Sequence, residues 1–312
     1  MTSSGRVDVG VVTWNSRDVT VAALGHMLEV VGDCEVRLLV RDNGSTDGTA
    51  DAITRSFPEA IVDAGSENLG FGAGMNLLIA RSDAPWFFAL NSDAWPERNC
   101  LSSLVAAARQ YPRAAAIAPR LLRLDGTLEH STYPFPSLRV ALMTASGAQR
   151  WLRRRATEML LEGAWRHDVG RPVDWAVGAA LLMRREALDD IGGFDERFFM
   201  YVEDLEWCWR AHQRGWEVYF EPSAAVRHIG NVSGAARYGD RRTAVYMANT
   251  YRFYREQHGA AATAAYRALN VVGAARNYAV ALAARDEARA RHWRHAVPAY
   301  LGRGAPEGEG RP

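Results

Sequence analysis

The feature that most constrains the fold of this chain is a repeated alternation of short apolar runs with segments of helical spacing. Residues 7–13 and 36–40 are rich in Val or Leu, and both runs stop abruptly at polar residues. A continuous apolar run is typical of a strand buried on both faces, and strands that alternate with helices form a parallel sheet. We therefore predict an α/β fold in which helices cover both faces of a mostly parallel sheet.

The alternation continues to about residue 118 and then weakens. Two more strands are predicted at 61–62 and 86–90, and helices at 19–31, 46–57, 73–81 and 99–111. Ser45 or Thr46 is expected to cap the second of these helices. After a stretch with few strand signals (132–172), we predict a short helix that ends at Gly192, a helix at 202–215, and strand-like segments at 217–220 and 224–226.

The C-terminal part of the chain differs from the rest in composition. Residues 237–303 are rich in Ala and hold 12 Arg against 4 acidic residues, a net charge of +8, whereas the remainder of the chain sums to −7. We predict an α/β domain over residues 1–236, in two halves (1–118 and 119–236). Residues 237–312 are predicted to form a helical, Arg-rich appendage with a disordered tail.

Charge and cysteine content exclude several classes of protein. The total net charge of +1 gives no global attraction to nucleic acid, which is not an expected partner. Cys34, Cys100 and Cys208 lack the spacing of a zinc site or a disulfide framework, which fits a reducing compartment. No signal peptide is recognisable, and there is no run of about 18 apolar residues that could span a bilayer. We therefore expect a cytoplasmic protein.

Polar side chains directly follow several of the predicted strands. Thr13, Asp42 and Asp93 stand at or after strand ends, and Asn68 lies in a glycine-broken loop. Because the carboxyl ends of parallel strands meet at one edge of a sheet, we expect these groups to converge there. A carboxylate such as that of Asp93 can bind a divalent cation that also contacts a diphosphate. Each residue alone is explained equally well as a turn residue or helix cap, and the shared edge is what favours a site.

Further candidates lie in the second half of the α/β domain. Glu203 and Asp204 begin a helix, where acids interact favourably with the helix dipole, but where a carboxylate can also accept the proton of an attacking hydroxyl. Arg210 could hold a carboxylate or phosphate, or form an ordinary surface pair. His228 could complete a metal site with Asp93, or be a structural histidine.

Taken in order, these motifs resemble those of the inverting nucleotide-sugar glycosyltransferases of family 2, which have the GT-A fold. The resemblance covers about residues 7–235 and is closest to the rhamnosyltransferase-like branch, which uses dTDP-rhamnose. The matching segments are VVTWNS (11–16), DNGSTDGT (42–49), ENLGFG (67–72) with Asn76, LNSD (90–93) at the DxD position, GGFDE (192–196), YVED (201–204) with Arg210, and His228 with Ser233 as the HxxxxS ending.

The resemblance implies a GT-A domain with a nucleotide-sugar-binding half (1–118) and an acceptor-binding, catalytic half (119–236). It implies that Asp204 is the general base with Glu203 beside it, and that Asp93 and His228 hold Mn²⁺ or Mg²⁺. The residues implied for donor binding are Thr13, Trp14, Asn15, Asp42, Gly44, Asn68, Gly70, Asn76, Asn91 and Ser92. Those implied to support the acceptor or the diphosphate are Trp175, Gly178, Arg210 and Ser233.

Two positions depart from the family pattern, and two other classes of protein compete with this interpretation. Asn91 replaces the first Asp of DxD, and Glu206 stands where the branch often has Asp; we expect both to be tolerated. A catalytically degenerate nucleotide-sugar-binding or glycan-binding module is disfavoured because Asp93, Asp204 and His228 are all present. A dinucleotide-binding oxidoreductase would need GxGxxG after the first strand, and none is there.

The expected partners are a dTDP- or UDP-sugar donor and a hydroxyl acceptor on a glycan, a lipid-linked sugar or a natural product, as in cell wall or polysaccharide biosynthesis. Residues 132–172 are expected to face the acceptor. The Arg-rich C-terminal region contains interleaved aromatic residues, which predicts peripheral contact with the inner face of an anionic membrane. The alternative is that this region is a solvated helical appendage.

Overall fold

The computed structural model describes residues 5–148, 167–230 and 238–304, and the chain divides into two compact units. One unit, here called the sheet unit, contains the described residues 5–133, 167–199 and 203–230. The other, the helical unit, contains the described residues 134–148, 200–202 and 238–304.

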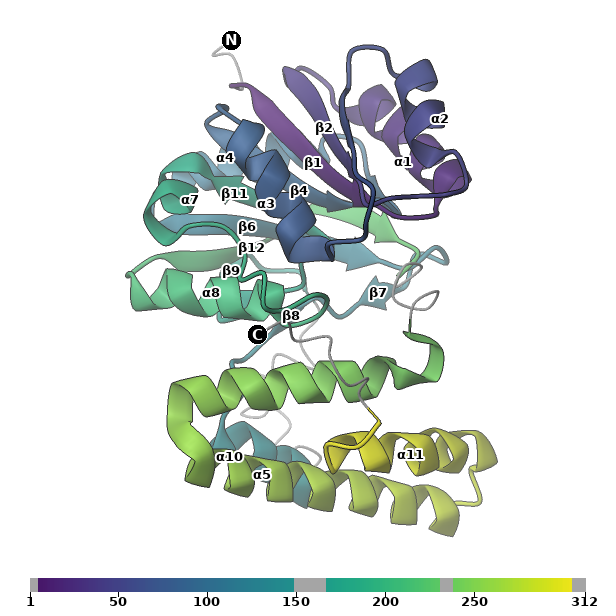
Figure 1. Cartoon of the computed structure of the whole chain (residues 1–312). Helices are drawn as coiled ribbons and strands as arrows, with labels where there is room; N and C mark the ends of the chain where they lie inside the picture. The colour runs from purple at the N-terminus through teal and green to yellow at the C-terminus, as the bar shows by residue number, and fades with distance from the viewer. Residues whose placement is uncertain (1–4, 149–166, 231–237, 305–312) are drawn as a thin grey trace. The chain divides into compact units, whose positions relative to one another are not determined.

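The sheet unit is built on a mixed sheet whose early strands are parallel (Figure 1). Neighbours in the series β3, β2, β1, β4 are parallel, as are β6 and β12, whereas β11 runs antiparallel between β4 and β6. The order is β3 (Ile61–Ala64), β2 (Val36–Asp42), β1 (Val7–Thr13), β4 (Trp86–Asn91), β11 (Ala180–Arg184), β6 (Ala114–Leu122), β12 (Glu217–His228) and β5 (Ala94–Pro96). In addition, β7 (Leu128–Glu129) pairs with β6, β9 (Arg171–Val173) pairs with β12, and β8 (Thr132–Tyr133) pairs with β10 (Trp175–Ala176).

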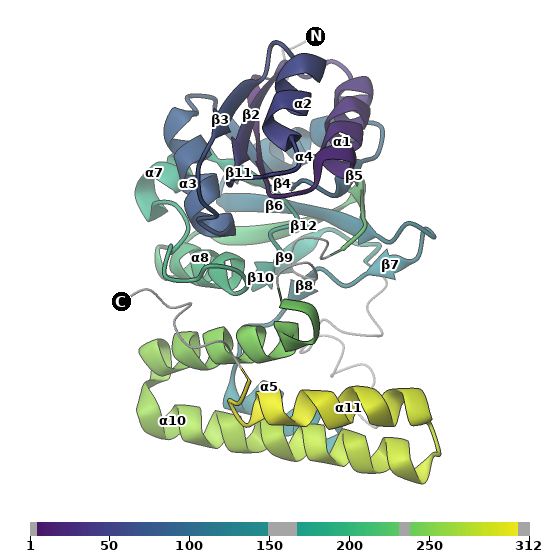
Figure 2. The ribbon, with the colours of Figure 1, turned by 45° about the vertical axis from the view of Figure 1, so that its right-hand side comes forward.

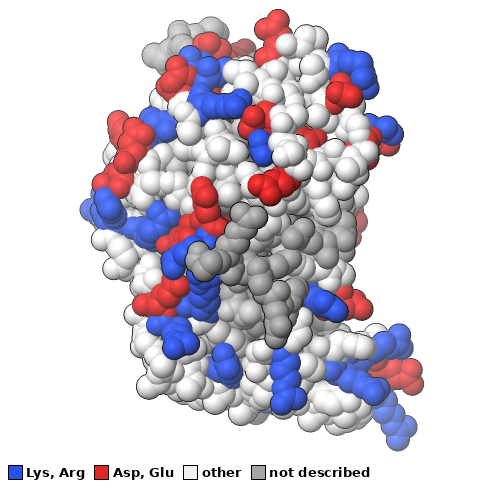
Figure 3. Space-filling model, viewed as in Figure 1, with Lys and Arg blue, Asp and Glu red and all other residues white. Residues whose placement is uncertain are grey.

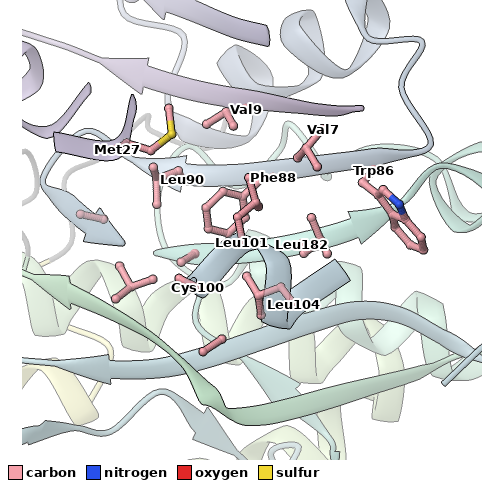
Figure 4. Close-up of a cluster of buried hydrophobic side chains, with 14 of the residues drawn as sticks. Val7, Val9, Met27, Trp86, Phe88, Leu90, Cys100, Leu101, Leu104 and Leu182 are labelled. Atoms are coloured by element: carbon pink, nitrogen blue, oxygen red, sulfur yellow. The ribbon is translucent and has the colours of Figure 1, made fainter. Parts of the chain in front are cut away.

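Side chains of β1 alternate between the two faces of the sheet. Helices cover both of these faces (Figure 2). Val7, Val9 and Val11 join α1 (Arg17–Val30), α2 (Thr49–Ser56) and α4 (Cys100–Gln110) in one buried cluster, part of which is drawn in Figure 4. On the opposite face, a Cβ at Gly10 would lie 3.1 Å from the sulfur of Met75 in α3 (Phe71–Arg81). The prediction of an α/β fold with helices on both faces is confirmed. The sheet unit is completed by α7 (Arg185–Ile191) and α8 (Glu203–Gln213).

The strand pattern of the second half differs from the prediction, which includes none of the short strands β7, β8, β9 and β10. The Ala-rich stretch Ala114–Leu122 forms β6, which the sequence analysis misses because Ala has a low strand propensity; its position between β11 and β12 overrides that propensity. The segments predicted separately at 217–220 and 224–226 belong to one strand, β12, which has an irregularity between Glu221 and Ala225.

The predicted cap of α2 is wrong. Gly48 occupies the N-cap position with a φ of 82°, and no side chain caps the helix there. Ser45 and Thr46 instead bond to Asn15 in the neighbouring loop. The helix therefore begins later than expected, because these hydroxyl residues belong to the loop that follows β2.

The helical unit confirms the predicted helical C-terminal appendage. Its described elements are α5 (Leu138–Ser146), a short 3₁₀ helix η2 (Gly239–Arg241), α10 (Arg242–Ala283) and α11 (Glu287–Tyr300). Both α5 and α11 pack on α10, which bends at Gly259, where φ is 80°. The predicted tail lies outside the described residues. None of the described helices combines the length and the apolar character that crossing a bilayer requires.

Candidate active site

The carboxyl ends of β1, β2 and β4 lie level with one another. Thr13 at the end of β1 pairs with Asp42 of β2, and Val12 pairs with Asn91 at the end of β4. Because β11 runs in the opposite direction, the residues just before it reach the same edge, where Asn91 N–H donates to the Ala179 carbonyl over 2.9 Å. This carboxyl-end edge therefore brings together loops that are far apart in the sequence.

Asn15 joins the loops that follow β1 and β2. Thr46 N–H donates to Asn15 Oδ1 over 2.8 Å, and Asn15 N–H donates to Ser45 Oγ over 2.8 Å. Thr13 is buried at this strand end and Trp14 is partly exposed beside it. The two loops are thus joined to each other by hydrogen bonds through Asn15.

Asp42 has a carboxylate oxygen without a protein partner. Its Oδ1 accepts Ser45 N–H over 2.7 Å, whereas its Oδ2 is buried and has no hydrogen-bond partner among the described residues. The residue is only 2% exposed. A buried acceptor that lacks a donor is unfavourable, so this oxygen is suited to receive an N–H of a ligand.

The loop between β3 and α3 approaches Asp42 closely because of glycine. Gly44 has a φ of 76°, and a Cβ there would lie 2.9 Å from the backbone nitrogen of Glu67. In that loop, Asn68 Oδ1 accepts Gly70 N–H over 3.0 Å. Asn68 therefore shapes the loop behind the edge through its own side chain.

The Asn76 side chain forms hydrogen bonds within the protein. Its Nδ2 donates to the Phe194 carbonyl over 2.8 Å, and its Oδ1 accepts Phe194 N–H over 2.7 Å. This two-way bond fixes the segment that precedes α8 against α3. Both polar atoms of the Asn76 amide are occupied, so its effect on a donor would be through this segment.

Asp93 and His228 are brought together from positions that are distant in the sequence. His228 Nε2 lies 3.3 Å from Asp93 Oδ1 and 3.3 Å from Asn91 Nδ2. The pairing of β12 with β5 and a bond from Ile229 N–H to the Asp93 carbonyl (3.1 Å) hold the two segments in register. Asp93, His228 and Ser92 are all buried.

Glu129 is a member of this cluster that the sequence analysis missed. It comes from β7, a strand of two residues, and its Oε2 lies 3.2 Å from His228 Nδ1. Burial lowers the pKa of His228, but the bonds to Asp93 and Glu129 outweigh burial and raise it to about 9. A lone Glu after a turn gives no sequence signal, so only the pairing of β7 with β6 reveals its position.

Two adjacent carboxylates open α8, as predicted, and their environments differ. Asp204 Oδ2 accepts Gly178 N–H over 2.8 Å and its Oδ1 accepts Leu205 N–H over 2.8 Å, whereas Glu203 Oε2 is buried without a partner among the described residues. Burial raises the pKa of both groups; the charge of Asp204 adds to the effect at Glu203, and the two N–H donors oppose it at Asp204. Gly178 is the contact that ties Asp204 to the sheet edge.

The backbone just before these carboxylates is strained. Tyr201 and Val202 have φ values of 70° and 80°, a region that bulky and β-branched residues rarely adopt. Such conformations typically cost about 1–3 kcal/mol each and are common at functional sites. The turn therefore sets where Glu203 and Asp204 enter the helix.

We expect Glu203→Gln to stabilise the protein at neutral and alkaline pH. The raised pKa means that ionised Glu203 destabilises the fold, whereas near pH 4.5, its ordinary pKa, the group is increasingly neutral in both states. Above neutral pH, the free energy of unfolding of the variant should therefore exceed that of the native protein by about 1–3 kcal/mol. This difference should vanish as the pH falls.

Thermal unfolding followed across pH measures this effect. Glu186→Gln, which changes an exposed Glu of α7, is the matched control and should shift stability by less than about 0.5 kcal/mol. A Glu203→Gln variant that is less stable than the native protein at every pH would contradict the assignment of a buried, unpartnered carboxylate.

The residues predicted to support the acceptor or diphosphate lie in different parts of the sheet unit. Trp175 is buried and stacks on Tyr133, with ring centroids 5.1 Å apart. Arg210 Nε donates to Glu206 Oε1 over 2.8 Å, and its two terminal nitrogens donate to the carbonyls of Ile191 and Gly193. The guanidinium of Arg210 thus holds the junction of α7 and α8, and a phosphate contact would have to replace these bonds. Ser233 lies outside the described residues.

Solved structures share this architecture. The mannosyltransferase PcManGT from Pyrobaculum calidifontis, in complex with GDP-Man and Mn²⁺, matches with a TM-score of 0.60 and 16% identity over 96% of this chain and 87% of its own. GalNAc-T7 with UDP, GalNAc and Mn²⁺ matches with a TM-score of 0.54 and 12% identity over 81% of this chain and 55% of its own. The fold is thus that of the GT-A glycosyltransferases.

Sequence comparison then identifies the family. The model described as "Glycosyl transferase family 2" matches residues 8–192, and the chain belongs to this family and is a glycosyltransferase. An N-acetylglucosaminyl-diphospho-decaprenol L-rhamnosyltransferase of Mycobacterium tuberculosis is 33% identical over 246 residues, 74% of this chain and 78% of the relative. A pre-mycofactocin glycosyltransferase of the same organism is 28% identical over 220 residues, 68% of this chain and 43% of the relative. The predicted family and its rhamnosyltransferase-like character are confirmed.

Proposed function

We propose that the protein transfers L-rhamnose from dTDP-rhamnose onto a hydroxyl of a lipid-linked sugar, with inversion at the anomeric carbon. The observation that carries the proposal is the common location of Asp42, the Asp93–His228 pair and Asp204 at the carboxyl-end edge of the sheet. The name of the mycobacterial relative supports both the sugar and the lipid-linked acceptor.

Asp42 is proposed to bind the pyrimidine base of the donor. Its buried Oδ2 lacks a partner among the described residues, and the imide N–H of thymine or uracil is a donor that it could accept. The loops joined by Asn15 and Gly44 form the surroundings of this oxygen. Base recognition by a buried carboxylate would exclude nucleotides that present no N–H at that place.

Asp93 and His228 are proposed to hold Mn²⁺ or Mg²⁺. A carboxylate oxygen and an imidazole nitrogen 3.3 Å apart are suitable ligands, and diphosphate oxygens and water would complete the coordination. No cluster of three or more His, Cys, Asp or Glu side chains fit to hold a metal occurs in the described ranges, so the donor would supply part of the site. When bound, the cation would stabilise the charge that develops on the departing diphosphate.

Glu129 is proposed to orient His228 for this task. Its contact with Nδ1 directs Nε2 toward Asp93. A carboxylate on the second nitrogen of a metal-binding imidazole commonly fixes the orientation of the ring and increases its basicity. This role depends on the metal assignment of the pair.

Asp204 is proposed to be the general base. The acceptor oxygen attacks the anomeric carbon from the face opposite the diphosphate, its proton passes to Asp204, and the bond from the anomeric carbon to the diphosphate oxygen breaks. The bond from Gly178 N–H fixes the carboxylate at the sheet edge. Burial raises its pKa, which makes the ionised form a stronger base.

A ligand screen tests the proposed donor. We expect dTDP-rhamnose to raise the thermal unfolding temperature in the presence of Mn²⁺, with a smaller shift without metal, and UDP-glucose, UDP-galactose, GDP-mannose and NAD to give smaller shifts. Asp42→Asn is the matched variant: it keeps the size of the side chain but places an amide where the base N–H would bind, and it should weaken donor binding by about 10-fold or more.

Other outcomes of the screen have definite meanings. Stabilisation by a different nucleotide sugar would change the donor and keep the reaction class. Binding of dTDP-rhamnose without any transfer to lipid-linked acceptors would favour a binding module that lacks catalysis. An unchanged response of Asp42→Asn would remove Asp42 from the donor site.

A further inference from the structure

The second half of α10 carries an exposed stripe that consists only of apolar side chains. Residues spaced three and four apart share one face of a helix, and here such a series of exposed positions runs through the helix. Its members, named the α10 stripe, are Ala261, Ala265, Ala268, Val272, Ala275, Ala279 and Leu282. Val272 is 57% exposed and Leu282 is 54% exposed. A helix face that borders only water is normally polar, so this face requires another explanation.

Aliphatic side chains are also exposed on the helix that packs beside it. Leu138 and Leu142 are one turn apart on α5 and are 39% and 58% exposed. Since α5 packs on α10, the helical unit presents large apolar side chains from two of its helices. A continuous exposed apolar stripe such as that of α10 is typical of an interaction surface.

The charge of the helical unit is strongly positive. Its described residues include 12 Arg and 4 acidic residues, and the stretch 257–284 contains no acidic residue. Arg289, Arg291 and Arg294 are exposed on α11, which packs against α10. On the face drawn in Figure 3, the helical unit shows arginines spread among uncharged atoms and few acidic side chains.

Two of those four acids are engaged within the helices. Glu256 pairs with Arg252 at 3.3 Å, and Asp286 caps α11 by accepting Arg289 N–H over 3.0 Å. Each of these acids cancels one positive charge locally, and the described part of the helical unit keeps a net charge of +8.

We propose that the α10 stripe lies on an anionic lipid membrane, with exposed arginines of the helical unit binding the phosphates of the lipid headgroups. Apolar side chains that enter the headgroup region and arginines that bind lipid phosphates are the two elements of interfacial binding. A second copy of this chain is the less favourable occupant, because it would bring two helical units of strongly positive net charge together.

This inference rests on the proposed function, because a lipid-linked acceptor is held in a membrane. Confinement to the same surface raises the effective concentration of enzyme and acceptor for each other. On this proposal, the helical unit holds the enzyme at the membrane that contains the acceptor, whereas the sheet edge carries out the sugar transfer.

Co-sedimentation of the full chain with lipid vesicles tests the surface. We expect binding to vesicles of phosphatidylcholine with phosphatidylglycerol at low salt, weak binding to phosphatidylcholine alone, and release as salt rises. The double variant Val272→Asp/Leu282→Asp should bind at least about 10-fold more weakly, because each Asp removes apolar area and adds a charge of the wrong sign. A triple change of Arg289, Arg291 and Arg294 to Ser should reduce both the affinity and its salt dependence.

Leu28→Asp/Leu124→Asp is the matched control. These two aliphatic residues belong to the sheet unit and are 39% and 58% exposed, so the control introduces the same charges outside the helical unit and should bind vesicles like the native chain. Circular dichroism of each variant checks that the helices remain folded.

Three results would overturn the proposal. The first is that the native chain does not bind anionic vesicles, and the second is that Val272→Asp/Leu282→Asp binds them as well as the native chain does. The third is a dimer, detected by light scattering, that this double variant dissociates; that result would assign the stripe to a second copy. Donor binding is measured separately by the thermal shift with dTDP-rhamnose. Loss of that shift with intact vesicle binding would refute the proposed donor and leave the membrane surface standing.

Discussion

Asp204→Asn should lower turnover by about 10³-fold or more while the protein still binds its donor. The substitution keeps the size of the side chain and one oxygen that can accept Gly178 N–H, which the carboxylate accepts over 2.8 Å. It removes the basicity that takes the acceptor proton. Because that proton moves only as the acceptor reacts, kcat should fall and the donor Kd should stay nearly constant. Radiolabelled sugar transfer and donor calorimetry on the same preparation measure the two quantities.

Asp189→Asn is a suitable control for this variant. It removes a carboxylate from α7 whose side chain is 66% exposed, and it should leave turnover unchanged. If Asp204→Asn retains native turnover, another group is the base, and Glu203 with its unpartnered Oε2 is the next candidate. If donor affinity falls with turnover, Asp204 supports the donor site rather than proton transfer.

Asp93→Ala should abolish the metal dependence of donor binding. In the native protein, Mn²⁺ should strengthen donor binding by about 10²-fold, and the variant should bind the donor equally weakly with and without the ion. The reason is that the pair of Asp93 and His228, 3.3 Å apart, loses its anionic ligand. Calorimetric titration of donor with and without Mn²⁺ gives this ratio directly.

His228→Ala and the double variant extend the test. Two ligands of one ion act together, so the double variant should lose little more than either single variant. Asp18→Ala, at a side chain that is 85% exposed on α1, is the control and should keep the full response to metal. An unchanged response to Mn²⁺ in Asp93→Ala would show that Asp93 is not a ligand.

The first half of the fold was predictable because its signals are local. The Val-rich and Leu-rich runs at 7–13 and 36–40 become β1 and β2, and the run at 86–90 becomes most of β4. Parallel strands align their ends, so the placement of Asp42 and Thr13 at one edge of the sheet followed from the strand assignment, and the structure adds that they lie opposite each other. The Ala-rich β6 was missed because its strand conformation depends on burial between neighbours and not on its own composition.

The side-chain contacts of the candidate site were harder to predict from the sequence than the fold was. The sequence indicated Asp93 and His228 but not Glu129, whose contact with His228 depends on how a two-residue strand pairs with β6. It also suggested ligand contacts for Asn76 and Arg210, and the structure shows that both side chains bond to backbone groups near α8. A polar side chain in a motif can act through the loop that it holds, and residue type alone does not distinguish this from direct contact.

By itself, the sequence determined the family, the α/β architecture, the helical C-terminal region and the polar edge of the sheet. Those conclusions depend on periodicity and on ordered motifs, which are properties of neighbouring residues. Only the tertiary structure decided that Asp42 Oδ2 is buried without a partner among the described residues, that Gly178 anchors Asp204, and that the α10 stripe is exposed. Burial and hydrogen bonding are relations between segments that the chain brings together only on folding, so no local pattern specifies them.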